Sequence, residues 1–421
     1  MIRRFDLPYG EETLAVGTAG VELTGIYTPR PTEPALAPEA LVRGALDNPI
    51  GSESLVEAAR GKNSALVLID DITRETPADL LLPPILDDLE SAGIAADDIL
   101  VMIALGTHRP MTDAEVRRKV GDEVLGRVRV TQHDHRTAPL RDLGVTPSGT
   151  PIEVNEHLFE ADIVIGTGAV VPHHIAGFSA GAKIVQPGVS GAATTAATHM
   201  FSARARTPLL GRVDTPVRAE MELIAERCGM RHVLNVTLNA DGRIVTARFG
   251  ATRPTYRRAV EDARRIYGVR APAGLDAVVA GSHPCDIEFW QAHKSLYPAM
   301  LMVRPGGTII VVTPCPEGVA VTHPDMLDYT AQPADELLRR YERNEIDDRV
   351  AASLAVAWAR VREYARVVLV SDGISRREAE ALGFDTAPDV ESALSVLARK
   401  SGTAPQVGVL THAPDTLPLV A

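Results

Sequence analysis

The sequence predicts an α/β fold of two domains, each built on a parallel-rich sheet, with an active-site cleft between them. The chain has 421 residues, of which 45% are hydrophobic, so it is long enough for two domains with buried cores. Short apolar runs alternate with helical patterns along most of its length. The stretch APAG at 271–274 separates two such series. We therefore expect domains at 1–270 and 271–421, and we allow the last residues to pack back on the first domain.

Strands and helices alternate in both series. In the first, strand-length apolar runs occur at 64–70, 98–106, 128–134 and 161–168, and a helical pattern at 78–93 contains two prolines that should limit its regularity. In the second, strand-like runs occur at 276–281, 308–314, 366–372 and 407–411, with helical patterns at 333–344 and 350–365. The proline-rich segment 28–40 is typical of an irregular connection. Such alternation is typical of parallel sheets, whose ligand sites lie at the carboxyl ends of the strands.

The composition excludes several classes of protein. A net charge of −12 opposes nucleic-acid binding, which relies on a basic surface. The apolar runs are too short to cross a membrane, and the first residues, MIRRFDLPYG, lack the apolar stretch of a signal peptide. Cys228, Cys285 and Cys315 are widely spaced and form no CxxC pair, so neither a disulfide framework nor a zinc site is indicated. We expect a cytoplasmic protein.

Polar clusters follow two of the predicted strands. Asp71, Thr73 and Arg74 come after the run at 64–70, and the planar fork of Arg74 suits a carboxylate or phosphate. A capping turn with a surface ion pair is an equally good interpretation. His108 follows the run at 98–106 and is a candidate general base near neutral pH, with a structural histidine as the alternative. The shared position at strand ends favours one common site.

The densest cluster lies between residues 166 and 191. Glycines at this density let the backbone approach an anion closely, with its N–H groups pointing at it. The spacing matches neither GxxxxGK[ST] nor GxGxxG, which argues against ordinary nucleotide-binding loops. A flexible surface loop is disfavoured, because apolar residues are mixed with two histidines and a lysine. On its own, Lys183 is best interpreted as a phosphate contact.

A fourth cluster belongs to the second domain. If residues 286–300 form a helix, Trp290, Gln291 and Lys294 share one of its faces and can cover a small anionic substrate. An ordinary amphipathic helix is the alternative. His199, which follows the glycine-rich segment, is on its own best interpreted as structural.

Taken in order, DDITRETP, GTHR, VPHHIAGFSAGAKIVQPG, the later His199 and WQAHK resemble the nickel-dependent lactate racemase family along most of the chain. The resemblance implies a nickel-pincer nucleotide, which is a pyridinium mononucleotide whose two sulfur arms help to hold nickel. It further implies that Lys183 forms a thioamide with this cofactor and that His199 is the fourth nickel ligand. With Lys183, we assign cofactor binding to Asp71, Thr73, Ser179, Gly181, Gly188 and Gly191.

The resemblance also implies a reaction, the racemisation or epimerisation of a 2-hydroxy acid. His108 and His174 would be the acid/base pair for the hydroxyl proton, while hydride moves reversibly to the cofactor through a 2-keto acid. His173 precedes His174, so this assignment can be off by one, and the spacing to Gly177 favours His174. Substrate binding is assigned to Arg74, Trp290, Gln291 and Lys294.

The resemblance leaves the substrate open, since the family acts on lactate, malate and larger hydroxy acids. The implied partners are a small 2-hydroxy acid and the enzymes that make the cofactor, with no nucleic acid and no membrane. Two other functions compete with this one. The first is a nucleotide-phosphate-dependent lyase or dehydrogenase with His108 as its base, and the second is a non-catalytic sensor of small acids.

Overall fold

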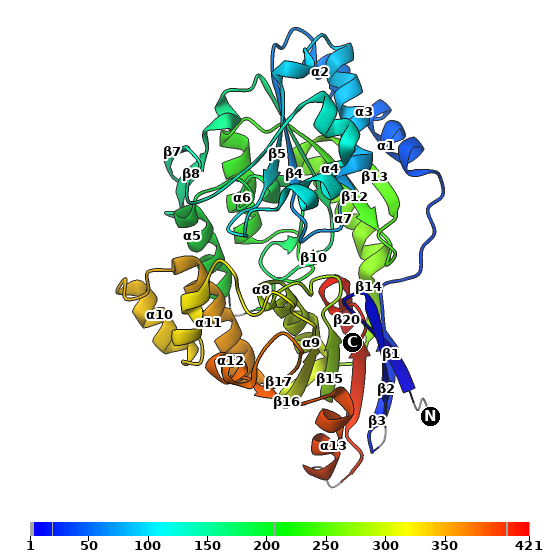
Figure 1. The fold of residues 1–421 in the computed structure, drawn as a ribbon, viewed down its shortest axis with the longest axis vertical. Coiled ribbons are helices and arrows are strands. Elements are labelled where there is room, and N and C mark those ends of the chain that lie inside the picture. Colours follow the sequence, from blue (N-terminus) through cyan, green and yellow to red (C-terminus); the bar gives the residue numbers. More distant parts are fainter. Residues whose placement is uncertain (1–3, 19, 206, 401–402, 421) are drawn as a thin grey trace.

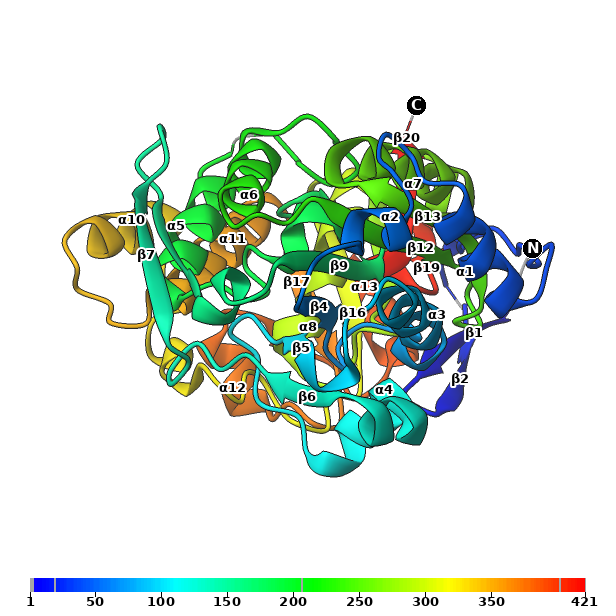
Figure 2. The ribbon, with the colours of Figure 1, turned by 90° about the horizontal axis from the view of Figure 1, so that it is seen from above.

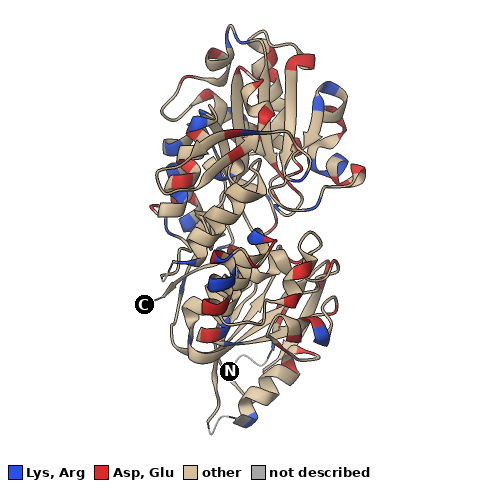
Figure 3. Cartoon of the chain, turned by 90° about the vertical axis from the view of Figure 1, so that its left-hand side faces the viewer, with Lys and Arg blue, Asp and Glu red and all other residues tan. Residues whose placement is uncertain are grey.

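The computed structural model describes residues 4–18, 20–205, 207–400 and 403–420. It contains two six-stranded sheets, one in each half of an elongated molecule (Figure 1). This arrangement confirms the predicted fold class. Charged residues of both signs are interspersed over both halves (Figure 3). No helix within the described residues is long and apolar enough to cross a membrane.

The first sheet has the order β13-β12-β9-β4-β5-β6. Its strands are parallel except that β13 runs antiparallel to β12. The central strand β4 is buried almost throughout, which explains why its sequence is continuously apolar rather than alternating. The strands are β4 (Ala65–Asp70), β5 (Ile99–Ala104), β6 (Arg129–Gln132), β9 (Ile163–Ala169), β12 (His232–Leu238) and β13 (Ile244–Ala251).

Helices cover both faces of this sheet, which lies between them in Figure 2. Alternate residues of β4 point to opposite sides, so Val67 and Ile69 belong to one apolar core while Leu66 and Leu68 belong to another. The first core includes residues of α1 (Pro38–Asp47), α2 (Leu55–Ala59), α3 (Ala78–Ser91) and α4 (Asp113–Arg127), and the second includes residues of α5 (Ala192–Ala203) and α6 (Pro216–Arg227). A further helix, α7 (Thr252–Tyr267), packs on β12 and β13.

The helix predicted at 78–93 is present, and the two prolines expected to limit its regularity do not break it. Pro83 and Pro84 lie inside α3, which runs unbroken from Ala78 to Ser91. Both prolines lack a backbone N–H, but the helix buries an apolar face against the sheet, and this packing outweighs the lost hydrogen bonds.

The second sheet has the order β18-β17-β16-β15-β19-β3, and all its strand pairs are parallel. Its strands are β3 (Glu22–Tyr27), β15 (Leu275–Gly281), β16 (Val303–Val312), β17 (Arg366–Val370), β18 (Asp385–Thr386) and β19 (Gln406–Leu410). Its helices are α8 (Phe289–Ala292), α9 (Leu296–Met302), α10 (Ala334–Glu342), α11 (Arg349–Tyr364), α12 (Arg376–Ala381) and α13 (Val390–Lys400).

The sheet pairing departs from the predicted domain division at the start of the chain. Strand β3 lies at the edge of the second sheet beside β19, and the hairpin of β1 (Arg4–Tyr9) and β2 (Glu12–Gly17) packs on the same half. The start of the chain is therefore part of the second unit, although we placed it in the first. Near the chain end, β20 (Leu417–Val420) pairs with β14 (Gly268–Ala271), the segment that leaves the first unit.

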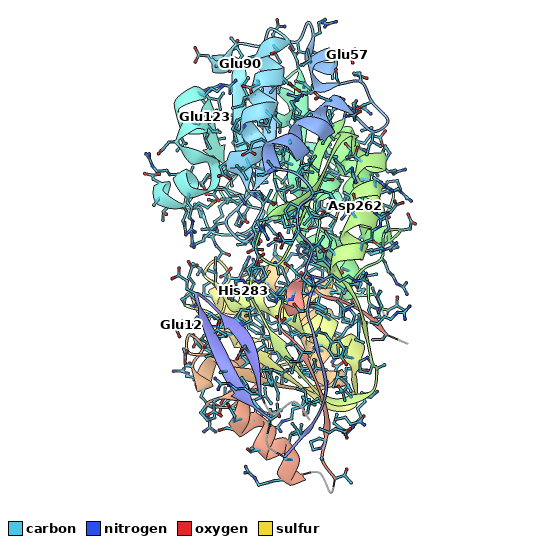
Figure 4. All side chains as sticks on the ribbon, turned by 90° about the vertical axis from the view of Figure 1, so that its right-hand side faces the viewer. Glu12, Glu57, Glu90, Glu123, Asp262 and His283 are labelled. Atoms are coloured by element: carbon cyan, nitrogen blue, oxygen red, sulfur yellow. The ribbon has the colours of Figure 1, made fainter. Side chains whose placement is uncertain are left out.

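The predicted helix at 286–300 is shorter than expected and interrupted. A turn in which Cys285 N–H donates to the Ser282 carbonyl precedes it, and helix α8 begins only at Phe289. A 3₁₀ turn, His293–Ser295, then joins α8 to α9. Side chains fill the junction between the two halves, where His283 is labelled in Figure 4. The elements that carry Trp290 and Lys294 thus face the first sheet across this junction.

Candidate active site

A cavity of about 830 Å³ lies where the strand ends of the first sheet meet α8 and the turn after it. Residues that follow β4 and β5 form one wall of the cavity, and the glycine-rich segment forms a second. Residues of the second half of the molecule form the third wall. These residues lie close together because the parallel strands of the first sheet end at the same edge. Of the predicted site residues, the cavity is lined by Asp71, Arg74, His108, His173, His174, Ser179, Lys183, Gly188, His199, Trp290, Gln291 and Lys294.

His108 is held by a buried carboxylate. Its Nδ1 lies 2.6 Å from Oδ2 of Asp71, and its Nε2 lies 3.0 Å from the amide nitrogen of Gln291. Burial raises the pKa of Asp71, but His108 and Arg74 lower it more, so its pKa stays well below the ordinary range. The ionised carboxylate therefore accepts from Nδ1–H, which leaves a lone pair on Nε2. Burial lowers the pKa of His108 more than Asp71 raises it, so the ring is neutral at pH 7 and suited to act as a base.

Lys183 lies in a short 3₁₀ turn of the glycine-rich segment, on the cavity wall. Burial lowers the pKa of its amine well below the ordinary value, and the charges of Arg74 and Lys294 lower it further. Within the described part of the chain, the amine forms no side-chain hydrogen bond or ion pair. Burial thus favours loss of the amine proton, and a deprotonated Lys183 is a nucleophile that can form a covalent bond with a bound carbonyl-type group.

His199 projects from α5 into the same cavity. Its Nδ1 lies 2.9 Å from the carbonyl oxygen of Thr195, one turn earlier, and must donate to it. This bond fixes the tautomer and leaves the Nε2 lone pair available as a metal ligand. Burial lowers the pKa of His199 to about 3, with a further contribution from Lys183, so the ring is neutral. Among the described residues, no group of three or more His, Cys, Asp or Glu side chains is placed to hold a metal ion.

The adjacent histidines His173 and His174 have different surroundings. Nδ1 of His173 accepts the backbone N–H groups of Ile175 and Ala176 at 3.2 and 3.4 Å, so its proton lies on Nε2. After burial, the charge of Lys183 is the largest factor that lowers the pKa of His173. The ring of His174 instead stacks on Tyr297 at 4.1 Å, and its Nε2 lies 3.3 Å from Nε2 of His293.

Gln291 joins the residues predicted to bind substrate. Its side-chain oxygen accepts from Lys294 at 2.5 Å and from Arg74 at 3.3 Å, while its amide contacts His108. Burial, reinforced by Arg74, lowers the pKa of Lys294 to about 8, so the ammonium still carries its charge at pH 7. Two cations beside a base are suited to hold a carboxylate with its neighbouring hydroxyl at His108. Trp290 lies beside them but stacks on His323 at 4.0 Å, which fixes its indole.

Four predicted cofactor residues make close contacts within the protein. The hydroxyl of Thr73 donates to Asp71 at 2.5 Å, and Ser179 lines the cavity but uses its hydroxyl to donate to the Ala169 carbonyl at 2.5 Å. Gly181 lies against the Tyr256 ring, where an added Cβ would approach within 2.8 Å, and Gly191 is confined in the same way by Glu153. Neither glycine lines the cavity, and close packing accounts for the lack of a side chain at both positions. Thr73 likewise lies outside it.

Three further residues were not singled out from the sequence. Arg218, buried on α6, donates to the carbonyls of Ala180, Ala176 and Phe178 and so holds the glycine-rich segment in place. His293 and Leu354 line the cavity from the second half. His293 could have been found from the sequence, because the WQAHK segment contains it. Nothing in the sequence distinguishes Leu354 from the other apolar residues of an amphipathic helix.

A lysine amine of lowered pKa, histidines on different walls and paired cations define an enzyme site for a small organic acid, set between two α/β units. Comparisons with known proteins specify this class further. The model of the lactate racemase N-terminal domain matches residues 9–208, and that of the lactate racemase C-terminal domain matches residues 270–417. The chain therefore belongs to the lactate racemase family, and it is an isomerase. That class replaces both the sensor and the lyase or dehydrogenase considered from the sequence.

Individual relatives agree with this assignment. A lactate racemase of Lactiplantibacillus plantarum is 27% identical over 430 residues, which cover 99% of each chain. A lactate racemase of Thermoanaerobacterium thermosaccharolyticum is 29% identical over 321 residues, 74% of this chain and 75% of the relative. The solved apoprotein of a lactate racemase from the latter organism has a TM-score of 0.87 at 24% identity, covering 99% of this chain and all of that one. A solved Thermotoga maritima protein has a TM-score of 0.70 at 21% identity, covering 93% of this chain and all of that one. At these identities the two structures support the fold alone.

Proposed function

We propose that the protein racemises or epimerises a 2-hydroxy acid with a nickel-pincer nucleotide carried on Lys183 and nickel bound through His199. One observation carries the proposal: the amine of Lys183, which has a lowered pKa and no side-chain partner among the described residues, shares a cavity with Nε2 of His199. The acid/base histidines and the paired cations line the same cavity, so a substrate bound there reaches all of them.

The residues fit such a cofactor. The Lys183 amine is suited to a thioamide link, and the orientation of His199 leaves one nitrogen donor for a metal. A single imidazole does not hold a divalent ion by itself, so the other donors would come from the bound group, whose sulfur arms suit nickel. When bound, this group supplies an electron-poor acceptor for hydride from the substrate C2, which side chains alone cannot provide.

The protein's own residues then bind the acid and move its hydroxyl proton. Arg74 and Lys294 hold the carboxylate, while Nε2 of His108, oriented by Asp71, takes the proton from the hydroxyl of one enantiomer. The hydroxyl of the other enantiomer points to the opposite side, so a second histidine is needed there. The product of proton and hydride removal is a planar 2-keto acid, and its reorientation before hydride return inverts the centre.

We assign the second acid/base role to His173 in place of His174. His173 has an N–H at Nε2 without a partner among the described residues, so it can hydrogen-bond the substrate oxygen; taking the hydroxyl proton at Nε2 requires the tautomer with the ring proton on Nδ1. It is also close enough to Arg74, Lys183 and Lys294 for their charges to lower its pKa. His174 is engaged with Tyr297 and His293 on the wall shared with a second cavity. The spacing to Gly177, which favoured His174, does not reveal which ring faces the substrate.

The names of the relatives support lactate or a lactate-like acid as substrate, and malate-like and larger 2-hydroxy acids remain within the proposal. The cofactor would come from its synthesis enzymes in the cell. We place the protein in the cytoplasm, where its three unpaired cysteines would stay reduced.

Chiral chromatography of enantiopure 2-hydroxy acids tests this proposal. The protein is co-produced with the cofactor-making enzymes, loaded with nickel and incubated with each acid. We expect at least one acid to be racemised, with deuterium at C2 retained in the product because hydride returns to the same carbon. Rapid exchange of the label with water would indicate proton abstraction from C2 and refute the hydride route. Absence of turnover for every acid would refute the function.

A further inference from the structure

A second cavity, of about 1330 Å³, adjoins the first and has no role in the mechanism above. It lies between α5, α9, α11 and the segment 207–210. The two cavities share four lining residues, so they are separated by single side chains rather than by a layer of structure. The shared residues are His174, Ile175, His199 and Leu354.

Leu354 is the shared residue contributed by the second half. It lies on α11, is 4% exposed and lines both cavities, so an aliphatic side chain on one helix forms part of the partition. A leucine is smaller than an aromatic residue, and its side chain presents an apolar surface to a ligand in either cavity. The C2 substituent of an acid held by Arg74 and Lys294 would therefore be separated from the second cavity by side chains such as Leu354, and not by a layer of backbone.

The wall of the second cavity is mainly apolar, with residues such as Leu209, Leu210 and Met300. Among the described residues that line it, the charged ones are Arg360, Asp335 and Glu363. Arg360 already donates to the Ala205 carbonyl. A second carboxylate on the substrate would lose its hydration against this mainly apolar wall, which disfavours it. The mainly apolar wall suits an aliphatic or aromatic group.

We propose that the second cavity is a subsite for the C2 substituent of the substrate, and that it takes a branched aliphatic or aromatic group larger than methyl. Leu354 and Ala357 determine this specificity. The inference rests on the proposed function for the identity of the ligand. It predicts that 3-phenyllactate and 2-hydroxyisocaproate are better substrates than lactate, and that malate is a poor one.

Filling the second cavity tests the proposal. Ala357, partly buried on α11, lines the second cavity and is absent from the lining of the first. Ala357→Phe should lower kcat/KM for 3-phenyllactate relative to lactate by about tenfold or more, because a few methylenes in an apolar pocket change specificity by this order. Ala219→Phe, on an exposed position of α6, is the matched control and should leave this ratio unchanged.

Two measurements separate ligand binding in the proposed subsite from the racemisation reaction. Ligand-observed NMR on the cofactor-loaded protein measures binding of lactate, 3-phenyllactate and malate without requiring turnover, and chiral chromatography measures racemisation. We expect 3-phenyllactate to bind about tenfold more tightly than lactate, and Ala357→Phe to remove the difference. If 3-phenyllactate binds in this way but no acid is racemised, the proposed function fails and the subsite stands.

Two results would overturn the subsite. Racemisation of lactate with no binding or turnover of 3-phenyllactate would leave the proposed function intact and refute the inference. An equal loss of activity with lactate and 3-phenyllactate in Ala357→Phe would show that the second cavity is an access route for any substrate.

Discussion

The contact between Asp71 and His108 gives the most direct prediction about the chemistry of the site. Asp71→Asn removes the charge that fixes Nδ1–H on His108, because an amide can either accept from Nδ1 or donate to it. Both tautomers then become available, and only one of them places a lone pair at Nε2. The perturbation is nearly isosteric, so the cavity keeps its shape while the base loses its orientation.

The size of the effect follows from the contact. The separation of 2.6 Å and the low pKa of Asp71 identify a charge-assisted hydrogen bond. A hydrogen bond to a charged group contributes about 1.5–3 kcal/mol, which corresponds to about 10- to 160-fold in rate if the transition state uses all of it. We therefore expect kcat to fall by about 10²-fold, within the usual range for general acid–base catalysis.

The pH profile gives a second readout. His108 must be neutral to act as a base, so activity is lost as pH falls through its pKa. Since burial sets that pKa below its ordinary value and the Asp71 carboxylate raises it, Asp71→Asn should move the acid limb to lower pH. Initial racemisation rates across pH 4–9, with the exposed-site variant Asp113→Asn as control, measure both effects. An unchanged kcat, or an acid limb shifted to higher pH, would refute the role given to Asp71.

Three other predictions address separate parts of the site. His173→Gln should lower kcat by about 10²-fold and His174→Gln by much less, and the reverse order would restore the original assignment. KM should rise above a pH of about 8 as Lys294 loses its proton, whereas Lys294→Arg should keep KM flat there. Arg218→Met removes charge-assisted hydrogen bonds to three carbonyls, each worth about 1.5–3 kcal/mol, so urea unfolding should show a large loss of stability. An unchanged unfolding midpoint would contradict that last role.

The sequence predicts the strands well where apolar runs are buried on both faces, as in β4 and β9. It also predicts that the clusters after β4 and β5 converge, because parallel strands end at one edge. The position of β3 could not be predicted. Its partner β19 lies at the other end of the chain, and local patterns carry no information on such pairing.

The roles of individual site residues also could not be predicted, because they depend on neighbours that are distant in the sequence. Spacing cannot distinguish His173 from His174, because adjacent residues project in different directions and only the packed neighbours decide which ring faces the ligand. Gly181 was assigned to the cofactor on glycine density, yet Tyr256 explains its lack of a side chain. Leu354 has no chemical signature at all, and its importance comes from the two cavities on either side of it.

The covalent anchor is the central claim, and peptide mass spectrometry tests it most directly. Protein co-produced with the cofactor-making enzymes is digested, and each lysine peptide is examined for an added mass together with the nickel content of the intact protein. The account predicts one adduct, on Lys183, and both adduct and nickel lost in Lys183→Ala. An adduct on another lysine, or an unmodified Lys183 in protein that racemises its substrate, would contradict it.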